Sequence, residues 1–186
     1  MRRLRGSSFG GRQRVSCAGI VLYVDACAVV KRYVDEDDTD TAALNSVFTD
    51  AERWGGLVSS EWLILEVASA LARKMRTSKM SAADFQRVMK KWRLDSQAVN
   101  LIAIESEHLR AAAALLETVP PVERFHAGDA IHLYTALQIK SDIGGADRLV
   151  LVTTDHGFKS TATVHGLDVH DPSADDVERL SEFFRN

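Results

Sequence analysis

The chain has 186 residues, of which 46% are hydrophobic and 26% are charged. These proportions are close to those of an average globular domain, and they argue against intrinsic disorder, a collagen-like repeat and a multidomain enzyme. The two cysteines, Cys17 and Cys27, cannot build a disulfide framework, and neither lies in a C-x-x-C pair. We expect one compact domain over residues 19–186.

The net charge of −3 conceals an uneven distribution. Residues 1–19 hold five arginines and no acid, which leaves 18 basic and 26 acidic residues in the rest of the chain. A second basic segment contains eight basic side chains and one acid: Arg73, Lys74, Arg76, Lys79, Arg87, Lys90, Lys91 and Arg93, with Asp84. Such a chain could hold a polyanion and a cation together, although two solvated charged faces would produce the same pattern.

The first 18 residues are rich in Gly, Ser and Arg and lack hydrophobic periodicity, which predicts a disordered basic leader. With the apolar run 15–24 they imitate a secretory signal, but Asp25 interrupts the pattern, and cleavage would remove the best strand of the sequence. No apolar stretch approaches the ~20 residues needed to span a bilayer. We therefore expect a cytoplasmic protein that is not inserted in a membrane.

Hydrophobic periodicity and turn residues predict strands that alternate with helices along the whole chain. The strands are expected at 19–24, 57–59, 98–104, 149–153 and 167–169. The helices are expected at 26–34, 39–53, 61–76 after an N-cap at Ser60, 82–94 after an N-cap at Ser81, 105–118, 127–140, 156–165 and 174–184. This alternation predicts an α/β fold, a three-layer α/β/α sandwich with a central parallel sheet of about five strands.

Two of the strongest strands end in an acid, the first at Asp25 and the fourth at Asp155. Ligands of open parallel sheets bind beyond the carboxyl ends of the strands, so both carboxylates would emerge at one edge if both strands are central. Aspartates at such positions also serve as helix N-caps, and each of the two could have that role instead.

Two further acids could join them from helices. Glu66 lies in a helical stretch that is apolar on nearly every side, where a partly desolvated carboxylate needs a compensating cation. That cation could be an Arg or Lys side chain, or a metal ion. Asp129 lies early in the helix 127–140, where it would either complement the helix dipole or face the same edge of the sheet.

Four converging carboxylates would repel one another, and a divalent ion would relieve the repulsion. Ligation by oxygen alone favours Mg²⁺ or Mn²⁺ over zinc. The sequence has no H-E-x-x-H, no Cys/His zinc spacing, no G-x-S-x-G, no Walker A and no G-x-G-x-x-G. The signatures of zinc proteases, serine hydrolases, P-loop NTPases and dinucleotide enzymes are thus absent.

From about Ile20 to Val169 the sequence resembles PIN-domain ribonucleases, specifically the VapC toxins of bacterial type II toxin–antitoxin pairs. Four blocks carry the resemblance, and their order and spacing together are more specific than any one of them. They are residues 23–33 (YVDACAVVKRY), 65–71 (LEVASAL), 129–136 (DAIHLYTA) and 151–155 (LVTTD). Two features depart from the family pattern: Cys27 stands where Ser or Thr is usual, and the basic leader has no counterpart.

The resemblance implies that Asp25, Glu66, Asp129 and Asp155 form the catalytic acidic quartet that binds Mg²⁺ or Mn²⁺, with Thr154 as a supporting hydroxyl. The implied activity is endonucleolytic hydrolysis of single-stranded RNA by a metal-activated water, without a nucleophilic side chain. The implied partners are an antitoxin, whose C-terminal segment would block the site, and a second copy of the chain in a homodimer. The eight basic residues of 73–93 are candidates for guiding RNA phosphates.

Two other functions fit the same residues. A PIN nuclease with a housekeeping role in RNA maturation would share the whole site, and a neighbouring antitoxin gene would distinguish the toxin from it. A non-catalytic binding module of the same fold would be favoured if the protein bound no Mn²⁺, or if Glu66 were paired with Arg73.

Overall fold

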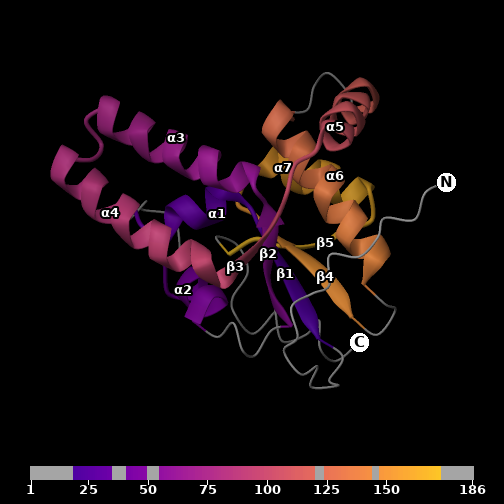
Figure 1. Ribbon diagram of the computed structural model, residues 1–186, viewed down its shortest axis with the longest axis horizontal. Coiled ribbons are helices and arrows are strands. Elements are labelled where there is room, and N and C mark those ends of the chain that lie inside the picture. The colour runs from indigo at the N-terminus through magenta and orange to yellow at the C-terminus, as the bar shows by residue number, and fades with distance from the viewer. Residues whose placement is uncertain (1–18, 35–40, 50–54, 120–123, 144–146, 173–186) are drawn as a thin grey trace.

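The computed structural model describes residues 19–34, 41–49, 55–119, 124–143 and 147–172 (Figure 1). The strands are β1 (Ile20–Val24), β2 (Gly56–Ser60), β3 (Val99–Ile102), β4 (Arg148–Val152) and β5 (Asp168–His170). The helices are α1 (Ala26–Lys31), α2 (Thr41–Thr49), α3 (Trp62–Arg76), α4 (Ala82–Asp95), the short 3₁₀ turn η1 (Ser96–Ala98), α5 (Ser106–Thr118), α6 (Ala127–Asp142) and α7 (His156–Val164).

The five strands form one sheet in the order β3-β2-β1-β4-β5, and every pair is parallel. The central strand β1 pairs with β4 along its whole length, from Ile20 opposite Arg148 to Val24 opposite Val152. The predicted α/β class and the five-stranded parallel sheet are confirmed.

Helices cover both faces of the sheet because β1 and β4 carry apolar side chains on both sides. Leu22 and Val24 of β1 belong to a core packed against α1, α2, α3 and α4. Tyr23 of β1 and Leu151 of β4 belong to a second core with residues of α6 and α7. Figure 1 shows these two helical layers on opposite sides of the sheet, which confirms the three-layer sandwich.

The order of the strands reverses at β1, because β2 and β3 lie on one side of it and β4 and β5 on the other. At such a switch point the connections leave the sheet toward opposite faces, and a crevice opens beyond the carboxyl ends of the two strands. The fold therefore predicts that ligands bind beyond Val24 and Val152.

Helices α3 and α4 form a hairpin that extends beyond the edge of the sheet (Figure 1). Ser81 caps α4 as predicted, since its side chain accepts a hydrogen bond from the backbone N–H of Asp84. Val88 and Trp92 bury one face of α4 in the core shared with α1 and α3. The basic segment 73–93 lies along this hairpin.

Several predicted boundaries differ from the structure. Ser60 is the last residue of β2 and not a helix cap, because β2 continues through it and α3 begins after Glu61. The first helix ends at Lys31, three residues earlier than expected, and the third strand covers Val99–Ile102 within the expected 98–104. The predictions for residues 1–18 and 174–184, and the ends of the predicted helix 39–53, lie outside the described residues. In the described part of the chain, no helix is both long and apolar enough to cross a bilayer.

Gly157 brings the start of α7 against the backbone that precedes α6. A Cβ atom at this position would lie 2.1 Å from the carbonyl oxygen of Arg124. We expect Gly157→Ala to lower the free energy of unfolding by about 1–3 kcal/mol, because backbone atoms cannot move aside as a side chain can. Urea denaturation would measure the change. Ser160→Ala, at an exposed position of the same helix, is the control and should be close to neutral; an equally small effect of Gly157→Ala would contradict the prediction.

Candidate metal centre at the carboxyl ends of β1 and β4

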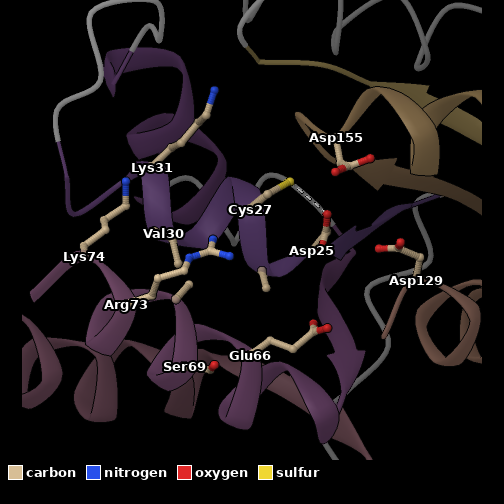
Figure 2. A pocket seen from close by; sticks show the side chains of 12 residues that line it. Asp25, Cys27, Val30, Lys31, Glu66, Ser69, Arg73, Lys74, Asp129 and Asp155 are labelled. Carbon is tan, nitrogen blue, oxygen red and sulfur yellow. Dashed lines mark hydrogen bonds between the residues drawn. The ribbon is translucent and has the colours of Figure 1, made fainter. Parts of the chain in front are cut away.

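The four predicted acids line one cavity of about 380 Å³. Asp25 follows β1, Asp155 precedes α7, Asp129 lies in the first turn of α6, and Glu66 lies in α3. Figure 2 shows these four side chains around a common space. The tertiary structure thus brings together all four residues that the sequence proposed for the site.

The pairing of β1 with β4 holds Asp25 in place. Because Val24 lies opposite Val152, the next residue of each strand, Asp25 and Thr153, are neighbours. The Thr153 hydroxyl donates a hydrogen bond of 2.7 Å to Oδ2 of Asp25, and the backbone N–H of Asp25 donates to the carbonyl of Val152. Asp25 occupies the N-cap position of α1, but its side chain makes no capping hydrogen bond. Its carboxylate is turned to the cavity instead.

Thr153 also connects two of the acids, because its hydroxyl accepts a hydrogen bond from the backbone N–H of Asp155. The resemblance to PIN-domain nucleases implies Thr154 as the supporting hydroxyl. In the structure the hydroxyl that contacts Asp25 belongs to Thr153, whereas Oγ1 of Thr154 is buried without a hydrogen-bond partner among the described residues.

Cys27 takes part in the same network. Its thiol donates to Oδ2 of Asp25 at 2.9 Å, and its sulfur accepts a hydrogen bond from the backbone N–H of Thr154. Burial raises the pKa of the Cys27 thiol well above its ordinary value, and the charge of Asp25 and the hydrogen bond to it act in the same direction. The residue at position 27 therefore remains a neutral donor to Asp25, as a hydroxyl would be.

Glu66 is paired with His132, a residue that was not predicted from the sequence. Oε2 of Glu66 lies 2.7 Å from Nε2 of His132, which is fully buried on α6. Among the described residues no ion pair joins Glu66 to Arg73, the pairing that would have favoured a binding module. The apolar neighbours Ile64 and Leu65 are about half exposed, so the burial of Glu66 comes from α6 rather than from its own helix. The spacing of Asp129 and His132, three residues apart on one helix, could have indicated that both lie on the face of α6 that meets the site.

His132 is held from both ends of its ring. Nδ1 is 2.8 Å from the hydroxyl of Tyr23 and 3.2 Å from that of Ser60. Burial alone would lower the pKa of His132, but the interactions with Tyr23 and with Glu66, together with the charge of Asp25, raise it to about 10. When the ring is protonated, it offsets part of the negative charge of the site.

The donor atoms closest to one another belong to Asp25, Glu66 and His132. One ligand atom from each lies within 4.8 Å of the others, so this group could hold a metal ion. His132 could be a ligand only without the Nε2 proton that it donates to Glu66, so with this hydrogen bond in place the carboxylates are the ligands. Asp129 and Asp155 line the same cavity and would add further oxygen ligands. The donor set fits a divalent cation, because one imidazolium cannot offset four converging carboxylates.

The pKa of Asp129 is raised, in part by repulsion from the other acids. Burial is the largest cause that raises its pKa, and the charges of Asp25, Asp155 and Glu66 add to it, whereas a hydrogen bond from the backbone of His126 opposes it. The result is a pKa of about 6. The same hydrogen bond, 2.6 Å from the N–H of His126 to Oδ2, is part of a capping box at the start of α6.

Asp155 caps a helix, the role that the sequence offered as an alternative to metal binding. Oδ1 of Asp155 accepts a hydrogen bond from the backbone N–H of Phe158 and caps α7. The carboxylate also lines the cavity, so capping positions it at the site rather than removing it.

The wall of the cavity opposite these acids is basic. Lys31, Arg73 and Lys74 line it, and Figure 2 shows the Arg73 guanidinium directed into the same space as the carboxylates. Two of the eight predicted RNA-binding residues, Arg73 and Lys74, are thus at the cavity. The other six lie farther along the α3–α4 hairpin and do not line it: Arg76, Lys79, Arg87, Lys90, Lys91 and Arg93.

A comparison with models of known protein families finds no match to the chain, and a search of curated proteins finds none either. The likeness to PIN-domain nucleases is therefore an interpretation of the four sequence blocks.

The raised pKa of Asp129 predicts how stability depends on pH in the metal-free protein. The folded-state pKa of about 6 lies above the ordinary 3.8, so the folded protein binds more protons than the unfolded chain between these values. This contribution to stability is present below about pH 4 and is lost as the pH rises through 6. Relative to wild type, Asp129→Asn should gain up to about 3 kcal/mol of unfolding free energy between pH 4 and 7.

Urea denaturation in EDTA at several pH values would measure this gain. Asp142→Asn is an exposed substitution at the end of the same helix, and its unfolding free energy should depend on pH as that of wild type does. A parallel curve for Asp129→Asn as well would show that Asp129 has no raised pKa.

Proposed function

We propose that the protein is an endoribonuclease that hydrolyses single-stranded RNA with bound Mg²⁺ or Mn²⁺. One observation carries the proposal: four carboxylates from four separate segments line a cavity whose opposite wall is formed by Lys31, Arg73 and Lys74. An acidic wall that holds a cation and a basic wall that holds an anion are together suited to a phosphodiester.

The acidic wall supports the hydrolytic part of the proposal. A divalent ion at such a site supplies a water of lowered pKa and offsets charge on the phosphate. Asp25 would hold it with an orientation set by Thr153 and Cys27. Glu66, Asp129 and Asp155 would complete the ligands from α3, α6 and the start of α7.

The basic wall supports RNA as the substrate class. Phosphates would be repelled by the carboxylates unless cations held them in the cavity, and Arg73 and Lys74 line it. The other six basic residues extend the positive charge along the hairpin, as expected for a path that follows a polyanionic backbone.

Loss of a metal ligand should abolish cleavage. We expect Asp25→Asn and Glu66→Gln each to lower kcat/KM on single-stranded RNA by at least about 100-fold, because each removes a charged ligand. EDTA should stop the wild-type reaction, and Mn²⁺ or Mg²⁺ should restore it. Cleavage of labelled RNA measures all three effects.

Two matched controls change exposed acids away from the cavity: Asp142→Asn and Glu117→Gln should cleave as wild type does. Full activity of the Asp25→Asn, Glu66→Gln double variant, or cleavage that persists in EDTA, would contradict the assignment of the site.

The cationic wall makes a separate prediction about binding. Arg73→Gln should weaken the binding of single-stranded RNA of any sequence and reduce the slope of log K against log salt concentration by about 0.7, the value for one lost phosphate contact. Fluorescence anisotropy in EDTA would measure this without cleavage. Arg110→Gln, an exposed change on α5, should leave the slope unchanged, and an unchanged slope for Arg73→Gln would remove it from the RNA path.

We further propose that the nuclease is the toxin of a toxin–antitoxin pair and is neutralised by a small antitoxin that places an Arg among the carboxylates. The likeness to VapC toxins that the four sequence blocks carry supports this role, and the homodimer is expected from that likeness alone. Expression of the chain alone should arrest growth and degrade RNA, and co-expression of the adjacent open reading frame should restore both. Growth without arrest would favour a housekeeping nuclease.

A non-catalytic polyanion-binding module is the second candidate, favoured by the pair of His132 and Glu66, which partly neutralises the acids without a metal ion. Calorimetric titration with Mn²⁺ distinguishes the two. A saturable site that is lost in Asp25→Asn supports the nuclease, and the absence of any site supports the binding module.

A further inference from the structure

Two residues of α6 contact the two oxygens of the Glu66 carboxylate. Nε2 of His132 lies 2.7 Å from Oε2. A Cβ atom at Gly128 would lie 1.9 Å from Oε1, so this oxygen occupies the space that any larger residue would fill. Because residues four apart share one face of a helix, Gly128 and His132 face α3 together.

We propose that Gly128 and His132 are positioning residues that hold the Glu66 carboxylate in the orientation needed for metal binding. The inference rests on the proposed metal centre and adds to it two residues that act through Glu66. Gly128 provides the space for one oxygen, and His132 donates its Nε2–H to the other.

The backbone does not explain the glycine at position 128. Among the described residues, Gly56 and Gly166 are the glycines with positive φ, so Gly128 has a conformation that other residues adopt readily. A glycine within a helix is less stable than alanine at the same position. The close approach of Glu66, and of the Trp62 indole nitrogen at 3.2 Å from the same Cβ position, gives the physical reason for it.

His132 is anchored firmly enough to orient another side chain. It is fully buried, and its Nδ1 contacts the hydroxyls of Tyr23 on β1 and Ser60 on β2. The ring therefore connects the sheet to Glu66, which is itself partly exposed to the cavity. Hydrogen bonds of this kind to a ligating carboxylate commonly change metal affinity by 10–100-fold when they are lost.

A double-mutant cycle with Glu66 tests the role of Gly128. In the metal-free protein, Gly128→Ala should lower the Tm, because the new methyl group displaces the carboxylate. In a Glu66→Ala background the same substitution should lower the Tm by less, since the carboxylate is gone and only the Trp62 indole nitrogen remains close to the new methyl group. Equal shifts of the Tm in the two backgrounds would overturn the proposal for Gly128.

Metal binding tests both residues without RNA. We expect Gly128→Ala and His132→Ala to weaken Mn²⁺ binding by about 10–100-fold in calorimetry. His132→Gln, whose amide can still donate to Glu66, should recover part of the loss, and His165→Gln, after the end of α7, is the control. Unchanged Mn²⁺ affinity in His132→Ala would overturn the proposal for His132.

Spin-echo spectroscopy of the bound Mn²⁺ separates positioning from ligation. A positioning role predicts no directly coordinated nitrogen, whereas nitrogen modulation that disappears in His132→Gln would show that His132 is itself a ligand and would overturn its positioning role. If wild type binds no Mn²⁺, the proposed nuclease fails, but the Tm cycle in the metal-free protein still tests the contact between Gly128 and Glu66.

Discussion

The parallel pairing of β1 with β4 fixes the position of Asp25 in the candidate site. Val24 lies opposite Val152, so both strands end at the same level, and Asp25 and Thr153 become neighbours across the switch point of the sheet. A shift of one residue in this register would turn the side chains of β1 to the opposite faces and separate Asp25 from Thr153. The buried apolar side chains on both faces of β1 resist such a shift, and core packing thereby fixes the position of a carboxylate.

Electrostatic repulsion is the second constraint, and the protein relieves it in three ways. A proton on Asp129, whose pKa is raised to about 6, removes one charge at mildly acidic pH. A proton on His132 would offset another, and a bound divalent ion would offset the rest. The metal-free protein can therefore fold with its acids close together, and a cation remains favourable because the compensation is incomplete.

The substrate that we propose follows from the asymmetry of the cavity. Carboxylates attract a metal ion but repel phosphates, whereas Arg73 and Lys74 attract phosphates from the other wall. The α3–α4 hairpin extends beyond the sheet (Figure 1), and six further basic residues lie along it. A polyanion could thus be held by the hairpin while one of its phosphates enters the acidic end of the cavity.

The sequence by itself determined the class of fold and the parallel sheet, and it named four acids that line one cavity in the structure. Apolar runs that end in an acid, as at Asp25 and Asp155, are local patterns that can be read without knowledge of packing. Only the tertiary structure decided the partners of these acids. Glu66 and His132 are 66 residues apart, and the contact of α3 with α6 depends on how both helices pack around the sheet. The register of neighbouring strands, which depends on long-range contacts, brings Thr153 and not Thr154 to Asp25. The direction of a helix face depends on such contacts as well, and only two of the eight predicted basic residues reach the cavity.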